Sequence, residues 1–216
     1  LGGRCRLWFA TLQTIACNPA RGGRRWASQR PAARPQPLRF STAREVFESF
    51  PSAHEAVTMP PTAEHPLAFL SRLAKGPAPA EAIGFCAFLL PRREAVWWAL
   101  QAVRAMQPPG TQDPGLAAAE AWVREPGDGT RFAALKLAQA GDRTSPGTWV
   151  AWAAGYSGGS MVESHAVPCP PDLTAKLARI AVLNAINRLP SRERGNALRN
   201  CIEACIRLTE DETGKR

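Results

Sequence analysis

The sequence predicts an all-α protein, and three observations support this fold class. Ala occupies 38 of the 216 positions, whereas Val and Ile together occupy 15; Ala favours helices and β-branched residues favour strands. Hydrophobic residues make up 45% of the chain, which is enough to form a core. Pro and Gly separate a series of short apolar segments. We expect about nine short helices in antiparallel hairpins, as either a curved α-solenoid-like (HEAT-like) stack or an irregular bundle.

The first three helices are predicted from their ends and their apolar faces. Residues 42–50 begin with a threonine that is suited to N-capping. Residues 66–74 follow a Pro-rich link and end before Gly76. Residues 79–90 open with a proline and are apolar almost all round, so we expect this helix to be central.

Six more helices follow, each bounded by Pro or Gly. The fourth of these six runs into a glycine-rich loop, and the last two complete the domain. Their predicted bounds are 92–106, 115–124, 129–140, 146–156, 172–187 and 191–209.

A weak internal repeat favours the hairpin arrangement. Pro91, Pro126 and Pro190 each follow the end of a predicted helix, and an Ala-Leu pair occurs at a similar offset in the helix that comes next. Pro91 and Pro126 are 35 residues apart, and repeats of this length are typical of stacked helical hairpins. An irregular bundle with short connections would give much the same pattern.

The positive charge of the chain is concentrated at its start. Residues 1–39 hold eight Arg and no acidic residue, whereas residues 40–216 hold 19 basic and 18 acidic side chains. We therefore predict an Arg/Pro-rich tail, either disordered or spurious, over 1–39 and a single all-helical domain over 40–216. The nearly neutral domain gives no indication of specific nucleic-acid binding. Association of the tail with nucleic acid is kept as an alternative function.

The sequence favours a cytoplasmic location. Its six Cys lack the spacing of a disulfide framework, which fits a reducing compartment. The longest charge-free stretch, 144–162, contains Pro146 and four Gly, so we expect no membrane span. Export is the alternative, because Arg4 and Arg6 precede a short apolar run at 7–17.

Five segments carry a resemblance to known proteins. They are FSTAREVFESFP, CAFLLPRREAVWWALQAV, AWVREP, WVAWAAGYSGGSM and VPCPPDLTAKLARIAVLNAI, within about residues 40–208. This region resembles a bacterial domain family of unknown function. The resemblance implies a compact helical domain in the bacterial cytoplasm, encoded near secretion genes, type VI systems among them. It implies no catalytic residues.

The glycine-rich loop contains the pattern of a nucleophile elbow. GYSGG at residues 155–159 fits G-x-S-x-G, and His165 follows it. A nucleophile elbow joins a strand to a helix, whereas here a predicted helix precedes the motif and a Pro-rich segment follows it. A small hydrolase that uses Ser157 is therefore an alternative function. The favoured interpretation is a glycine-capped helix end whose free carbonyl groups are satisfied by Ser157 and Ser160, in a loop that can also bind an anion or a peptide.

Four residues offer the ligand types of a zinc site. His165, Cys169, Cys201 and Cys205 form two pairs with three intervening residues. The two last cysteines also belong to an apolar stripe of the final helix, and cysteine is among the most buried residue types. We therefore predict core cysteines and no cofactor, with zinc as the minor alternative.

Two adjacent tryptophans on the helix 92–106 suggest a binding surface. Trp97 and Trp98 point about 100° apart and lie off the centre of the apolar face. Tryptophan beside arginine is the composition favoured at protein-binding hot spots. A binding surface here requires at least one of the two indoles to be partly exposed beside Arg93 or Arg104. The alternative is that a second layer of helices buries it.

Together these observations predict a non-enzymatic protein-interaction module, an adaptor or accessory protein of a bacterial multiprotein system. Its partner is another protein, which the sequence does not identify. The predicted binding residues are Arg92, Arg93, Trp97, Trp98, Arg104, Ser157, Gly158, Gly159 and Ser160.

Overall fold

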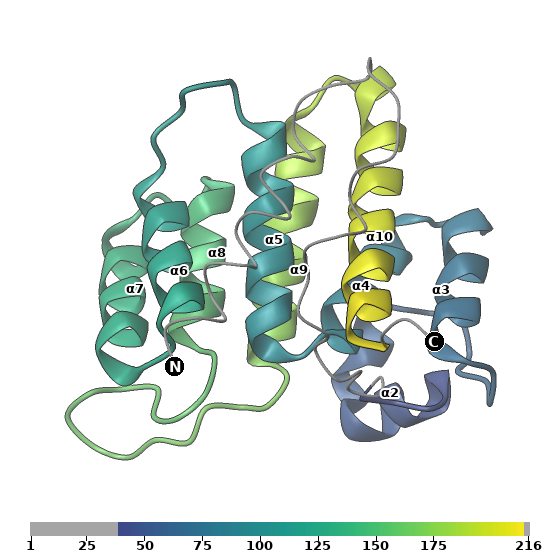
Figure 1. The fold of residues 1–216 in the computed structure, drawn as a ribbon, viewed down its shortest axis with the longest axis horizontal. Coiled ribbons are helices and arrows are strands. Elements are labelled where there is room, and N and C mark those ends of the chain that lie inside the picture. Colours follow the sequence, from purple (N-terminus) through teal and green to yellow (C-terminus); the bar gives the residue numbers. More distant parts are fainter. Residues whose placement is uncertain (1–38, 214–216) are drawn as a thin grey trace, which may run out of the picture.

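The computed structural model describes residues 39–213, and within them the fold is all-α, as predicted (Figure 1). The predicted tail, 1–39, lies outside the described residues except for Arg39. The described part contains nine α-helices and one 3-10 helix: α2 (Ala43–Ser49), η2 (Pro51–Glu55), α3 (Pro66–Lys75), α4 (Ala80–Leu89), α5 (Arg92–Met106), α6 (Pro114–Arg124), α7 (Asp128–Ala140), α8 (Pro146–Gly155), α9 (Leu173–Arg188) and α10 (Ser191–Thr213).

All nine predicted helices are present, because their end signals act locally. The side chain of Thr42 accepts a hydrogen bond from Glu45 N and caps α2. Proline occupies the first turn of α3, α6 and α8. The sequence analysis did not predict the 3-10 helix η2, and α10 continues beyond the predicted end at residue 209.

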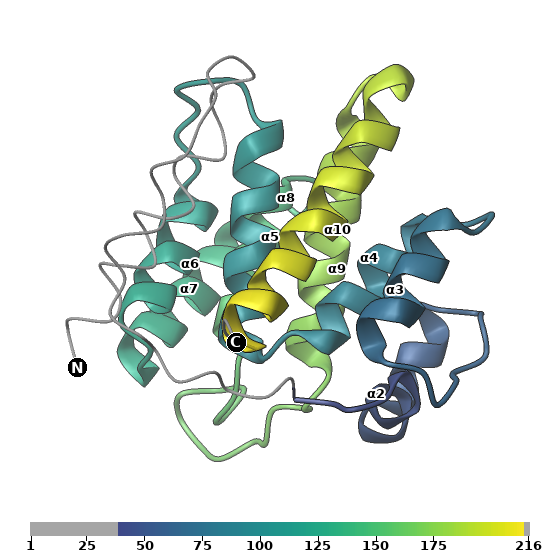
Figure 2. The same cartoon turned by 45° about the vertical axis from the view of Figure 1, so that its right-hand side comes forward.

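The helices form an irregular arrangement in which α9 connects the two ends of the domain. Figures 1 and 2 show α6 and α7 at one end, α2 and α3 at the other, and α5 and α9 between them. Helix α9 packs against α8, α5 and α4, and α10 returns to contact α3, α4 and α5. A solenoid limits each hairpin to contacts with its neighbours, so the solenoid-like alternative is not confirmed.

Helix α4 lies at the centre of the core, as its sequence predicts. Eight of its ten residues are buried. The rings of Phe47 and Phe69 lie 5.9 Å apart, and each also contacts Phe85 of α4. The segment that begins at Phe40 therefore packs into the same core as the later helices. In the described part of the chain, no helix is both long and apolar enough to cross a membrane.

The first turns of α6 and α8 approach each other at two glycines. Asp113 caps α6, with Oδ1 accepting hydrogen bonds from Gly115 N at 2.9 Å and Leu116 N at 3.1 Å. A Cβ atom on Gly115 would lie 2.6 Å from the carbonyl carbon of Gly147, and one on Gly147 would overlap the Asp113 carboxylate. The contact therefore requires glycine on both helices.

A substitution at this contact should destabilise the fold. We expect Gly147→Ala to lower the free energy of unfolding by about 2 kcal/mol, because the new methyl group forces Asp113 and α6 to move. Gly129→Ala is the matched control, since Gly129 also lies in the first turn of a helix but has no atom within 4 Å of a Cβ position. The control should gain up to about 1 kcal/mol from helix propensity. Urea unfolding followed by circular dichroism measures both, and equal stabilities would contradict the proposed contact.

Candidate functional site

The candidate site is the loop that joins α8 to α9, residues 156–172. Gly158 and Gly159 have φ values of 150° and 61°, which favour glycine. The chain then folds back on itself, with Met161 N donating to Val167 O at 2.7 Å and Cys169 N donating to Gly159 O at 3.0 Å. The loop therefore has a hydrogen-bonded frame and a tip at residues 162–166.

A buried arginine of α7 holds the start of this frame. Arg131 is only 4% exposed. Its Nη1 donates to Gly155 O at 3.1 Å and to Ser160 O at 2.6 Å, while Nε and Nη2 donate to Asp128 Oδ1 at 3.0 and 2.8 Å. The planar fork of the guanidinium allows one side chain to reach all three acceptors. Arg131 thus ties the C-terminus of α8 to the loop.

A second arginine reaches the loop from the start of α5. Arg92 Nη1 donates to Ser157 O at 3.3 Å. A Cβ atom on Gly158 would lie 3.1 Å from Arg92 Nη1, and one on Gly159 would lie 3.2 Å from Arg131 Nη2. The backbone conformation favours glycine at both positions, and a Cβ atom there would also make the two guanidinium groups shift by a few tenths of an ångström.

The sequence-based assignment of the capping groups is wrong. The carbonyl groups of Gly155, Ser157 and Ser160 accept from arginines, not from the Ser157 or Ser160 hydroxyl. The Ser160 hydroxyl instead donates to His165 O at 2.8 Å and accepts from Val162 N and Val167 N. Ser160 therefore organises the tip of the loop. The two arginines reach these carbonyl groups from α5 and α7. Contacts between segments so far apart in the chain cannot be predicted from the local sequence.

The residues of the hydrolase alternative are not brought together. Ser157 is 8% exposed, and its hydroxyl makes no hydrogen bond with His165. The ring of His165 pairs with its neighbour instead, with 2.9 Å between Nδ1 and Ser164 Oγ. A serine nucleophile needs a base within hydrogen-bond reach, so this geometry gives the alternative no support.

The four residues of the zinc alternative also lie in different surroundings. The thiol of Cys169 donates to Tyr156 O at 3.0 Å in the loop, whereas Cys201 and Cys205 are buried on α10. Burial raises the pKa of the Cys201 thiol to about 12. Burial also raises the pKa of Cys169, although Arg92 and Arg131 offset part of the effect. Among the described residues, no three His, Cys, Asp or Glu side chains are positioned to hold a metal ion.

The structure agrees with the alternative in which neighbouring helices bury both tryptophans, and it does not provide the exposed indole that the binding surface requires. Trp97 and Trp98 are each 1% exposed. The physical reason is that α5 packs against α6 and α8 as well as α9 and α10, so neighbouring helices cover the directions of both indoles. Trp98 Nε1 donates to Cys201 O of α10 at 2.9 Å. These side chains are core residues and not anchors of a surface.

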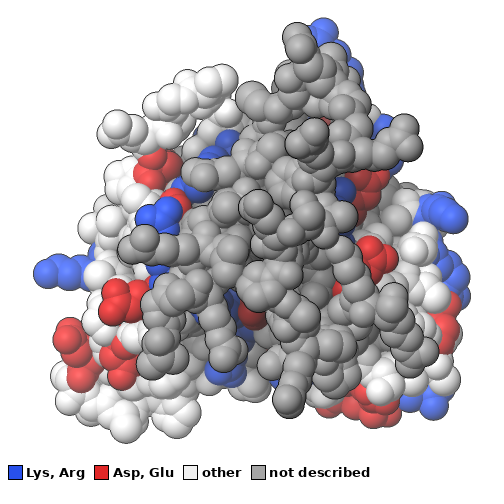
Figure 3. All heavy atoms as spheres, viewed as in Figure 1, with Lys and Arg blue, Asp and Glu red and all other residues white. Residues whose placement is uncertain are grey.

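Two other arginines of the predicted surface also act within the fold. Arg93 Nε and Nη2 donate to Val123 O at 2.8 and 2.6 Å, which satisfies a carbonyl at the end of α6. Arg104 Nη2 lies 2.5 Å from Glu120 Oε2, which joins α5 to α6. On the visible part of the face in Figure 3, basic and acidic side chains are interspersed. This agrees with the near-neutral charge of residues 40–216.

The sequence analysis missed Arg131, although a signal was present. Arg131 is three, four and seven residues before Ala134, Leu135 and Ala138, which are all buried. It therefore lies on the buried stripe of α7. A charged residue on such a stripe requires hydrogen-bond partners from another element, and here the loop provides them.

The family of the chain follows from residues 69–209. This region matches the model of DUF6931, a family of unknown function. The chain belongs to this family. The DUF6931 region begins within α3 and ends within α10, so the segment 40–51 that contributed to the resemblance precedes it. A comparison with curated proteins and one with solved structures found no match.

The two adjacent tryptophans of α5, Trp97 and Trp98, should contribute strongly to stability. We expect Trp97→Ala and Trp98→Ala each to lower the free energy of unfolding by about 3–5 kcal/mol, through lost burial and the cavity left behind. Trp149→Ala, at a partly buried position, should cost less. Guanidinium chloride unfolding measures all three. A loss below about 1 kcal/mol for Trp97 or Trp98 would show that the indole is exposed.

Removal of the Arg131 guanidinium should release the loop. We expect a protease specific for glutamate to cleave Arg131→Met after Glu163 at least about tenfold faster than the wild type, because two hydrogen bonds to a charged donor are lost. Arg143→Met is the control, because Arg143 is exposed and lies outside the loop. Mass spectrometry of the fragments over time gives the rates. Equal cleavage of the two variants would mean that Arg131 does not fix the loop.

Proposed function

We propose that this DUF6931 protein is a non-enzymatic protein-interaction domain and that the α8–α9 loop, residues 156–172, is its docking surface. One observation carries the proposal: a frame held by buried side chains presents an exposed apolar tip. Val162 is 36% exposed and is the one exposed large hydrophobic residue among those whose burial the structure describes. Glu163, Ser164 and His165 beside it are also exposed.

The fixed frame favours binding because the loop loses its conformational entropy when the protein folds and not when a partner binds. Arg131, Arg92 and the backbone bonds between Gly159 and Cys169 already restrict the conformation of the loop. Thr174 Oγ1 adds a bond to Tyr156 O at 2.8 Å. A preorganised loop gives up less conformational freedom when a partner binds. Rigid scaffolds with functional loops are common in binding proteins.

The chemistry of the tip indicates the kind of partner. An exposed valine ringed by polar side chains is suited to a small apolar depression with a polar rim on another protein. The proposed setting is a bacterial multiprotein system, which the resemblance to a bacterial family near secretion genes supports. The proposed compartment is the cytoplasm, because the described cysteines are free thiols. Nucleic-acid association of the tail falls outside the described residues and stays a prediction.

Photo-crosslinking in cells of the native host tests the docking surface. A photoreactive amino acid in place of Val162 should give a discrete protein adduct, whereas the same amino acid in place of Gln139, which is exposed on α7, should not. Arg131→Met should reduce the Val162 adduct, because the released loop no longer presents its tip in one conformation. Identical adducts from both positions, or no adduct from Val162, would contradict the proposal. Mass spectrometry of the adduct identifies the partner.

A further inference from the structure

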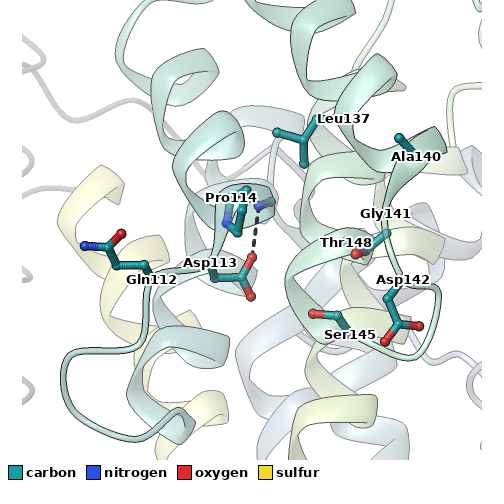
Figure 4. A pocket seen from close by; sticks show the side chains of 10 residues that line it. Gln112, Asp113, Pro114, Leu137, Ala140, Gly141, Asp142, Ser145 and Thr148 are labelled. Carbon is teal, nitrogen blue, oxygen red and sulfur yellow. Dashed lines mark hydrogen bonds between the residues drawn. The ribbon is translucent and has the colours of Figure 1, made fainter.

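A second feature, separate from the loop, lies where α6, α7 and α8 meet. A hollow of about 460 Å³ opens between the first turns of α6 and α8 and the end of α7 (Figure 4). Hollows of this size accommodate small organic ligands. Polar groups from Asp113, Ser145 and Thr148 line it together with the apolar side chains of Pro114 and Leu137.

The Asp113 carboxylate is held in a fixed orientation in the wall. Its Oδ1 accepts from Gly115 N and Leu116 N, and its Oδ2 accepts from Gln107 Nε2 at 2.8 Å. A carboxylate oxygen has two lone pairs, so Oδ2 retains acceptor capacity. No Lys, Arg or His side chain in the described part of the chain forms an ion pair with Asp113.

The Thr148 hydroxyl is an independent indication of a ligand. Thr148 is 5% exposed, lines the hollow, and forms no side-chain hydrogen bond with another residue that the structure describes. In Figure 4 its oxygen is directed toward the side of the hollow on which Asp113 lies. Ser145, at the N-cap of α8, makes no capping bond with its side chain. The Thr148 oxygen faces the hollow and is not one of the fully buried atoms without a partner, so a ligand there would take the place of water as its hydrogen-bond partner.

The charges around the hollow favour a cation. Asp113 and Asp142 are both in its wall, and no basic residue is. The end of α7 also faces the hollow, and its last turn contains no basic residue to offset the partial negative charge of a helix C-terminus. The Asp113 carboxylate lies against Gly147 and so offsets the partial positive charge at the start of α8. An anionic ligand would therefore meet the Asp113 carboxylate without a compensating side chain, whereas the Asp142 carboxylate accepts from Thr144 and interacts with Arg188.

We propose that this hollow binds a primary alkylammonium group. The ammonium group has three N–H donors, and the Asp113 carboxylate and the hydroxyls of Ser145 and Thr148 provide three acceptors. The alkyl chain lies against Pro114 and Leu137. A free amine and a lysine side chain of another protein share this chemistry, so the experiment distinguishes these two sources. The site does not depend on the docking loop.

Calorimetric titration of the full chain with two amines tests the proposal. The probes are putrescine, as a free amine, and Nα-acetyl-lysine methylamide, as a lysine side chain. We expect saturable binding of at least one of them, and the tighter of the two assigns the source. Tetramethylammonium, which has no N–H donor, and butylguanidine, which has a planar guanidinium and no primary amine, should each bind at least about tenfold more weakly.

Variants of the acceptors separate binding from folding. Thr148→Val keeps the shape of the side chain and should weaken amine binding at least about tenfold, whereas Thr148→Ser, which retains the hydroxyl, should bind nearly as the wild type does. Asp113→Asn keeps a residue suited to N-capping but removes the charge, so it should also lose binding. Ser71→Ala on α3 is the control and should leave binding unchanged. Absence of saturable binding to the wild type, or equal binding by Thr148→Val and wild type, would overturn the proposal.

Discussion

Two adjacent indole rings on one helix impose the main constraint on this fold. The rings of Trp97 and Trp98 leave α5 in directions about 100° apart, so a single neighbouring helix cannot bury both. Helices α6 and α8 together with α9 and α10 therefore surround α5. This arrangement makes α9 a shared wall between the two ends of the domain, and it brings α10 back to the centre, where Cys201 O accepts from Trp98.

Arginine side chains donate hydrogen bonds to backbone carbonyl groups at the C-terminal ends of several helices. Arg93 donates to Val123 O at the end of α6, and Arg131 donates to Gly155 O at the end of α8. Arg194 donates to Leu189 O at 2.9 Å and to Asn187 O at 2.8 Å, at the end of α9. A guanidinium is well suited to this position, because it has several donors and its charge interacts favourably with the helix dipole. Much of the positive charge of the domain is thus used within the fold.

The sequence predicted the helices well, because their ends depend on residues within a few positions. Proline and capping residues set the starts of α3, α6 and α8, and α5 begins and ends where expected. A helical wheel also identified α4 as central. The same reasoning left the exposure of Trp97 open, because a wheel describes one helix and not the number of helices that surround it.

The candidate site includes part of the surface that the sequence analysis proposed. The glycine loop was recognised as special, and Gly158 and Gly159 do have backbone angles that favour glycine. Its supports were missed, because Arg92 and Arg131 come from helices 65 and 29 residues away from their acceptors Ser157 and Ser160. The contact between Asp113 and Gly147 was missed for the same reason, since it joins the starts of two helices that are not consecutive.

In the α8–α9 loop, the residues that fix the conformation of the loop are different from the residues exposed at its tip. The bonds that fix its frame join residues outside the tip, such as Arg131 to Ser160 and Met161 to Val167. Only the Ser160 hydroxyl also bonds to the tip, where it donates to His165 O and accepts from Val162 N. Residues 162–166 can therefore vary in length and composition while Arg92, Arg131 and the core keep their partners. If the loop is the proposed docking surface, a change in its tip can alter which partner binds while the helical domain keeps its stability.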